Sequence, residues 1–192
     1  MTRLHLIRHG PTHAKSMVGW SDLPADLSDT DLLARLSGHL PQDALVVSSD
    51  LIRAADTASA IQGDRHRLPH RAGLREINFG AWELRRYAEI DAEDPVLARA
   101  YWETPGDIFP PGGESWHQVC NRVNTEVDAL IASHPGSDLI VVGHFGMILT
   151  QVQRALAITA EQAFSHRIDN LSVTEIARIP DGWHVGRINH LV

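Results

Sequence analysis

Three short apolar segments that end abruptly in polar residues constrain the fold of this chain most strongly. They are residues 4–7 (LHLI), 44–47 (ALVV) and 139–143 (LIVVG). Short runs of this kind, closed by polar or glycine residues, are typical of buried parallel strands. Stretches with a helical pattern separate the three segments. Because strands that alternate with helices form parallel sheets, the pattern predicts an α/β fold.

The clearest helical pattern covers residues 115–133. Its apolar side chains recur at a spacing that puts them on one face of a helix: Trp116, Val119, Cys120, Val123, Val127, Leu130 and Ile131. Ser115 and Gln118 have the three-residue spacing of a capping box, which begins a helix. The sequence His134-Pro135-Gly136 then ends it.

Three further helices are expected over residues 32–40, 51–62 and 146–157. Polar residues that are good N-caps precede the first two: Ser28, Asp29 and Thr30, and then Ser49 and Asp50. Residues 171–188 contain two β-rich runs around a Pro-Asp-Gly turn, which predicts a β-hairpin. Residues 64–113, rich in Pro, Gly and Trp, predict a cap-like insertion of loops and helices beside the sheet.

Length and charge narrow the classes of protein that fit. The 192 residues suit one domain, and we expect residues 1–192 to form it. A net charge of −7 argues against nucleic acid as a partner. No apolar run approaches the ~20 residues of a membrane helix, and no signal-peptide pattern is present, so we expect a cytoplasmic protein without a membrane partner. Monomer and homodimer are both compatible with the sequence.

Charged side chains follow each predicted strand at its carboxyl end. Arg8 and His9 follow the first strand, and His144 follows the third. Arg53 lies one turn into the helix after the second strand. Ligands of open α/β sheets bind outside the carboxyl ends of the strands. If the three strands are neighbours, these four side chains converge on one edge of the sheet.

This set of side chains suits phosphoryl chemistry. Two guanidinium groups bind phosphoryl oxygens and stabilise the charge on them, and a neutral imidazole attacks phosphorus to form a phosphohistidine. The leaving group also needs a proton donor, and Glu76 is the candidate, because a neighbouring phosphate favours a protonated carboxyl. Three other carboxylates nearby in the sequence are alternatives for this role: Glu83, Glu89 and Glu114.

A metal site is not expected among the histidines at positions 5, 9 and 13. Their four-residue spacing would align them on a helix. On the predicted strand the same spacing separates them by about 13 Å per step.

The chain resembles the histidine phosphatase superfamily, whose members have the phosphoglycerate mutase-like fold. The resemblance depends on five segments that occur in the family's order and cover nearly the whole chain. They are residues 6–12 (LIRHGPT), 48–58 (SSDLIRAADTA), 74–83 (LREINFGAWE), 110–115 (PPGGES) and 141–144 (VVGH). An isolated Arg-His-Gly would be weak support, whereas the ordered set is specific.

The resemblance implies a three-layer α/β/α sandwich around a mixed, mostly parallel sheet. It implies that His9 is the nucleophile and that Glu76 protonates the leaving oxygen and then activates water. Three residues would form the phosphate pocket: Arg8, Arg53 and His144. The resemblance also implies that neither a metal nor another cofactor takes part.

Four further residues are expected to bind substrate: Thr12, Lys15, Trp20 and Phe145. Thr12 belongs to the first motif, and Trp20 lies in the loop after the nucleophile. Lys15 stands where the family usually has Asn, and Phe145 stands where Gly commonly follows the second His. These departures bear on the choice of substrate more than on catalysis.

The sequence therefore predicts a metal-independent phosphomonoesterase that acts on a small phosphorylated metabolite through a phosphohistidine. The motifs look most like those of alpha-ribazole phosphatases and their broad-specificity relatives, which makes alpha-ribazole 5'-phosphate a candidate substrate. Three alternatives stay open: a phosphoglycerate mutase-type phosphotransferase, a protein phosphatase acting on phosphohistidine, and a non-catalytic sensor of phosphorylated ligands. The compact chain favours a phosphatase over a mutase.

Overall fold

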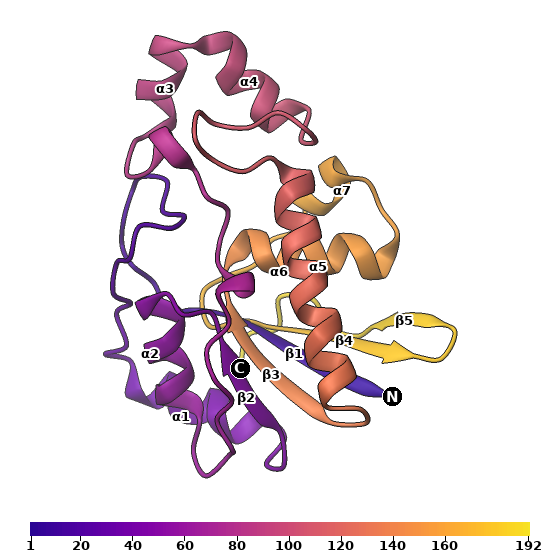
Figure 1. The fold of residues 1–192 in the computed structure, drawn as a ribbon. Coiled ribbons are helices and arrows are strands. Elements are labelled where there is room, and N and C mark those ends of the chain that lie inside the picture. The colour runs from indigo at the N-terminus through magenta and orange to yellow at the C-terminus, as the bar shows by residue number, and fades with distance from the viewer.

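A five-stranded mixed sheet lies between two layers of helices in the computed structural model, which describes residues 1–192 (Figure 1). The strands follow the order β2-β3-β1-β4-β5 across the sheet. The parallel strands are β1 (Thr2–Arg8), β2 (Leu45–Ser48) and β3 (Asp138–Gly143). The antiparallel hairpin consists of β4 (Val173–Ile179) and β5 (Gly182–Val185). The predicted strands, hairpin and three-layer architecture are confirmed.

Alternate side chains of the central strands enter two hydrophobic cores, one on each face of the sheet. Leu6 of β1 packs in the larger core, and the next residue, Ile7, packs in the smaller one. The helices over the smaller core are α1 (Thr30–His39) and α2 (Ile52–Ile61). Those over the larger core are α5 (Trp116–Ser133) and α6 (Phe145–Leu156). Both faces are buried because helices cover both, which explains the nearly unbroken apolar runs.

Residues between α2 and α5 form shorter elements: η1 (Ala72–Leu74), η2 (Gly80–Trp82), α3 (Tyr87–Glu93) and α4 (Pro95–Glu103). Figure 1 shows α3 and α4 beyond the carboxyl ends of the parallel strands. One more short helix, α7 (Ala160–Phe164), follows α6. No helix combines the length and the apolar character needed to cross a membrane.

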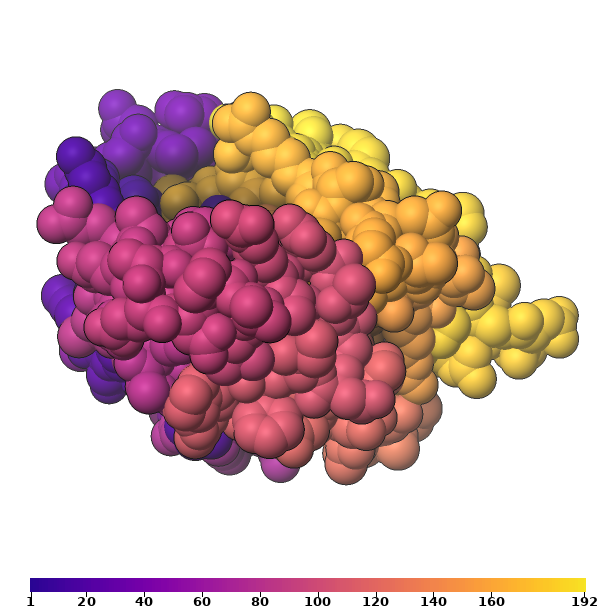
Figure 2. All heavy atoms as spheres, turned by 90° about the horizontal axis from the view of Figure 1, so that it is seen from above, coloured from indigo at the N-terminus to yellow at the C-terminus, as the bar shows by residue number.

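The surface at the carboxyl ends of the strands is hollowed. Figure 2, seen from this end, shows a depression between the purple segment near residue 30 and the gold segment near residue 165. A cavity of about 440 Å³ lies between residues from these two segments, with Leu32 and Arg167 among its walls.

The predicted helix starts are confirmed at two helices and wrong at a third. Asp29 caps α1 by accepting a hydrogen bond from the Leu32 amide, and Ser115 forms the expected capping box of α5. The N-cap of α2 is Leu51, whose side chain makes no capping hydrogen bond. Ser49 and Asp50 have other partners, described below, and so do not cap this helix.

Arg65 ties the carboxyl ends of α1 and α2 together. Its side chain is almost fully buried, at 4% exposure. Its guanidinium donates to carbonyl oxygens at the ends of both helices: Ser37, Leu40, Pro41, Ile61 and Gln62. The last carbonyl groups of a helix lack partners within the helix, so this side chain supplies them.

We expect Arg65→Met to lower the free energy of unfolding by about 3 kcal/mol or more, because it leaves several buried carbonyl groups without donors. Urea denaturation followed by circular dichroism measures the change. Arg35→Met is the matched control on the exposed face of α1, with an expected change within about 0.5 kcal/mol. Equal losses in the two variants would contradict the capping role.

Candidate active site

The structure brings together the polar side chains that follow β1, β2 and β3. They meet at a cavity of about 130 Å³ whose lining consists of Arg8, His9, Thr12, Ala14, Ser16, Val18, Arg53 and Glu76. His144 is completely buried next to this cavity, with its ring centroid 5.1 Å from that of His9. The convergence follows from strand order, because β1 and β2 both pair with β3.

The hydrogen bonds of His9 leave its Nε2 lone pair facing a guanidinium. Nδ1 lies 2.6 Å from the Gly10 carbonyl oxygen, which accepts only, so Nδ1 carries the proton. Nε2 accepts a hydrogen bond from Arg53 Nε at 3.2 Å. Burial, aided by the charges of Arg53 and Arg8, lowers the pKa of His9 to about 3. The imidazole is therefore neutral at physiological pH, with Nε2 as its basic atom.

Two guanidinium groups place positive charge at the same cavity. Arg53 is only 1% exposed and donates to the carbonyl oxygens of Gly19 and Ser21, at 2.6 and 2.9 Å. Arg8 donates to the Ile168 carbonyl oxygen at 2.7 Å, while its buried Nε has no partner. Neither guanidinium is hydrogen-bonded to a carboxylate, so an anion in the cavity would supply the missing partner.

His144 presents a second unpartnered donor. Its Nε2 lies 2.9 Å from Ser49 Oγ, and Ser49 Oγ already accepts from the Leu51 amide. No other acceptor bonds to this hydroxyl, so we assign its proton to the hydrogen bond with Nε2 and the ring proton of His144 to Nδ1. That Nδ1 is buried and has no partner. Burial first, and then the neighbouring His9 and arginines, hold the pKa of His144 well below its usual range.

Glu76 is the one carboxylate in the cavity lining. Its Oε1 accepts hydrogen bonds from the amides of Ile77 and Gly146, both at 3.0 Å. Burial raises the pKa of Glu76 and outweighs these hydrogen bonds and the nearby arginines, which act in the opposite direction. A side chain at position 146 would overlap Glu76 Oε1, so this close approach requires glycine.

Of the four residues expected to bind substrate, only Thr12 lines the cavity. The other three, Lys15, Trp20 and Phe145, lie outside its lining. Lys15 is exposed, although its neighbours Ala14 and Ser16 line the cavity. Phe145 is half-buried against the larger core, with its ring 5.5 Å from the Arg8 guanidinium. Lys15 and Phe145 therefore flank the site without entering it.

Trp20 supports the loop that carries Glu76. Its indole Nε1 donates to the Glu76 carbonyl oxygen at 2.9 Å. Its ring packs against the guanidinium groups of Arg75 and Arg122, at 4.7 and 5.9 Å. Arg75 is itself paired with Asp50, at 2.6 Å. Trp20 thus lies behind the proton-donor candidate rather than in the cavity.

Sequence reasoning missed a clamp formed by Arg122 and Glu114. The two side chains form a bidentate ion pair with both distances at 2.7 Å. Arg122 also donates to the carbonyl oxygens of Gly73, Arg75 and Glu76. Glu114 lies in a matched family segment, but no local pattern marks Arg122, which sits on the polar side of α5.

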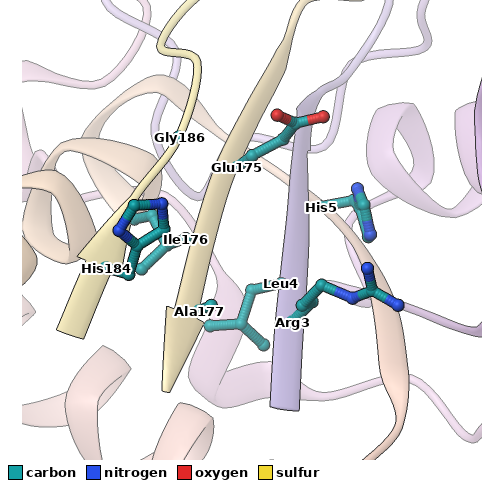
Figure 3. Close-up of a pocket in the computed structure, with 8 residues that line it drawn as sticks. All are labelled: Arg3, Leu4, His5, Glu175, Ile176, Ala177, His184 and Gly186. Atoms are coloured by element: carbon teal, nitrogen blue, oxygen red, sulfur yellow. The ribbon is translucent and has the colours of Figure 1, made fainter. Parts of the chain in front are cut away.

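A separate hollow of about 210 Å³ lies on the sheet over β1, β4 and β5 (Figure 3). His5, Glu175 and His184 line this hollow from the three strands, and His5 lies opposite Glu175 in the pairing of β1 with β4 (Figure 3). His5 lies 3.4 Å from Asp138, and the exposed His13 lies 2.7 Å from Asp26. The histidines at positions 5, 9 and 13 therefore have three different sets of neighbours.

Comparison with known proteins shows the family of this chain. The sequence profile of the histidine phosphatase superfamily (branch 1) matches residues 4–191. The chain is 34% identical over 190 residues to a bifunctional protein of Mycobacterium tuberculosis, covering 91% of this chain but 50% of that relative. The chain therefore spans about half the length of this relative. It is 29% identical over 177 residues to the adenosylcobalamin/alpha-ribazole phosphatase of Salmonella typhimurium, covering 87% of this chain and 86% of that protein.

A third relative is similar to this chain in sequence, and a solved structure of an enzyme of the same name is similar to it in fold. The glucosyl-3-phosphoglycerate phosphatase of Mycobacterium tuberculosis is 37% identical over 162 residues, covering 76% of this chain and 71% of that protein. A solved structure of a mycobacterial enzyme of this name superposes with a TM-score of 0.83 at 28% identity, covering 99% of both chains. The motif order, the fold and the family profile agree, and this chain belongs to the histidine phosphatase superfamily.

Proposed function

We propose that this chain hydrolyses phosphomonoesters through a phosphohistidine on His9. One observation carries the proposal: the neutral His9, with Nε2 as its basic atom, lies in a cavity shared with the guanidinium groups of Arg8 and Arg53 and a carboxyl of raised pKa. These are the nucleophile, the charge stabilisers and the acid that phosphoryl transfer needs.

In the first step, Nε2 of His9 attacks phosphorus and forms the phosphorus–nitrogen bond. The bond from phosphorus to the ester oxygen breaks, and its electron pair stays on that oxygen, which takes the proton of Glu76. Arg8 Nε and His144 Nδ1, neither of which has a hydrogen-bond partner within the protein, donate to the phosphoryl oxygens. Arg53 moves its hydrogen bond from Nε2 to the phosphoryl group, which frees the lone pair for attack.

In the second step, the Glu76 carboxylate takes a proton from water while the water oxygen attacks phosphorus. The phosphorus–nitrogen bond breaks and its electron pair returns to Nε2. The products are the alcohol and inorganic phosphate, and both His9 and Glu76 regain their starting protonation states. The same carboxyl therefore serves as acid and then as base.

The size of the cavity favours a small phosphorylated metabolite whose alcohol part lies outside. At about 130 Å³, the cavity is well below the ~300 Å³ of the smallest pockets that enclose a drug-sized ligand. Three small or apolar side chains line it beside the guanidinium groups: Ala14, Ser16 and Val18. Alpha-ribazole 5'-phosphate and glucosyl-3-phosphoglycerate are the first candidates, since relatives are named for these substrates.

The test is phosphate release from a panel of phosphomonoesters in EDTA. The panel contains p-nitrophenyl phosphate, sugar phosphates, phosphoglycerates, nucleotides, alpha-ribazole 5'-phosphate and glucosyl-3-phosphoglycerate. Release that persists in EDTA is the expected result, and the preferred ester identifies the substrate class. Transfer to a second hydroxyl would indicate a mutase, and activity only on a phosphohistidine protein would indicate a protein phosphatase. Binding without release would indicate a sensor.

We expect kcat/KM for an alkyl phosphate to fall on the alkaline side as Glu76 ionises. Because burial raises the pKa of Glu76, the acid form persists above the pH at which a free glutamate loses its proton. Because burial lowers the pKa of His9 to about 3, the nucleophile stays unprotonated across the measured pH range.

The pH profile is measured from pH 4.5 to 9 in wild type and in Glu76→Gln. The variant keeps the effect of the substrate's own ionisation near pH ~6 and loses only the limb that belongs to Glu76. An unchanged alkaline limb in the variant would contradict the assignment.

A further inference from the structure

Glu83 gathers the amide groups of a loop that lies against the candidate active site. Its carboxylate accepts hydrogen bonds from three consecutive amides, those of Gly19, Trp20 and Ser21, at 3.0, 2.7 and 3.2 Å. It also accepts from Ser21 Oγ at 2.6 Å and from the Phe79 amide at 3.1 Å. Glu83 does not line the cavity, so this carboxylate is committed to the loop.

The same loop turns its carbonyl groups toward Arg53. Gly19 and Ser21 accept from the two terminal nitrogens of the guanidinium, while its Nε reaches His9. Arg53 has no carboxylate within hydrogen-bonding distance. The position of its charge therefore depends on these two carbonyl groups. Glu83 holds the Gly19 carbonyl through the Trp20 amide of the same peptide unit, and it holds Ser21 through that residue's own amide and hydroxyl.

Trp20, which lies between Gly19 and Ser21 in the loop, links Glu83 to the segment that carries the candidate acid Glu76. Its amide bonds to Glu83 and its indole bonds to the Glu76 carbonyl oxygen. Gly19 has no room for a side chain, because a Cβ there would overlap the Ile77 carbonyl oxygen and the Glu83 carboxylate. The loop is thus fixed on one side by Glu83 and on the other by Arg53.

We propose that Glu83 is a positioning residue that sets the orientation of Arg53 toward the phosphoryl group through the loop of residues 19–21. This inference depends on the proposed function for its catalytic consequence, but not for its effect on anion binding. The carboxylate is suited to the task because it only accepts hydrogen bonds. Those hydrogen bonds also hold its pKa below the usual range despite burial, so it stays ionised.

Glu83→Gln is the central variant. A glutamine amide turns an N–H group toward loop amides that also donate, so the loop shifts and Arg53 loses its alignment. We expect the affinity for inorganic phosphate, measured by calorimetry, to weaken about 100-fold. We expect kcat/KM to fall by a similar factor for p-nitrophenyl phosphate and for an alkyl phosphate, since binding the phosphoryl charge matters equally for both.

Glu114→Gln is the matched control, because Glu114 is another carboxylate that accepts from an amide and an arginine. It supports the Glu76 segment through Arg122. We expect this variant to bind inorganic phosphate like wild type and to lose more activity on the alkyl than on the aryl phosphate. Glu89→Gln, at an exposed helix start, is expected to match wild type in every assay.

Equal weakening of phosphate binding by Glu83→Gln and Glu114→Gln would overturn the proposal, because it would mean general loosening. Wild-type phosphate affinity in Glu83→Gln would overturn it as well. If that variant does not fold, Ser21→Ala removes one hydrogen bond to Glu83 and is expected to weaken phosphate binding about tenfold. Wild type that binds phosphate but releases none from any ester would refute the proposed function alone. Wild type that does not bind phosphate would refute both.

Discussion

We expect His9→Asn to lower phosphate release from every phosphomonoester by about 10⁴-fold or more, because it removes the only nitrogen lone pair that faces the two arginines. Losses of this size are measured when a catalytic nucleophile is removed from a site that still binds its substrate. Steady-state release of inorganic phosphate gives the number. The fold survives because His9 contributes its backbone to the sheet edge, where its amide bonds to the Gly143 carbonyl oxygen.

Detection of the covalent intermediate is a second test of His9→Asn. Wild type mixed with a ³²P-labelled ester and quenched in alkali should retain label that is released by acid, the behaviour of a phosphohistidine. His9→Asn should retain none, and His5→Asn, in the hollow over β1, should label like wild type. Label that survives in His9→Asn would place the nucleophile elsewhere.

We expect Glu76→Gln to separate substrates by their leaving groups. An alkoxide needs a proton as it departs, so kcat/KM for an alkyl phosphate should fall about 10³-fold. A p-nitrophenolate needs little help, so kcat/KM for p-nitrophenyl phosphate should fall only about tenfold. Glutamine keeps the shape of the side chain but cannot give a proton to the leaving oxygen. The difference between the losses on the two esters therefore measures proton donation by Glu76.

Equal losses on both esters would contradict the acid role and leave Glu76 as a structural residue. The positive control is the alkaline limb of the pH profile, which should disappear in the same variant. Inorganic phosphate should bind Glu76→Gln at least as tightly as wild type, because a neutral side chain does not repel the anion.

The fold and the core of the site could be predicted because their signals are local. Buried strands appear as short apolar runs and helices as apolar stripes, so the sheet, the hairpin and α5 follow from periodicity. Strand polarity then places Arg8, His9 and His144 at one edge. The wrong cap of α2 shows the limit of this reasoning, since Ser49 has the chemistry of an N-cap but bonds to His144 across the fold.

The sequence by itself determined which chemical groups are present and which strand ends carry them. Only the tertiary structure decided how these groups are held: Glu83 bonds to a loop more than sixty residues away in the chain, and Arg122 reaches back to the Glu76 segment. The physical reason is that both contacts join a charged side chain to backbone amide or carbonyl groups. Every residue type except proline offers the same backbone groups, so such contacts leave no pattern in the sequence.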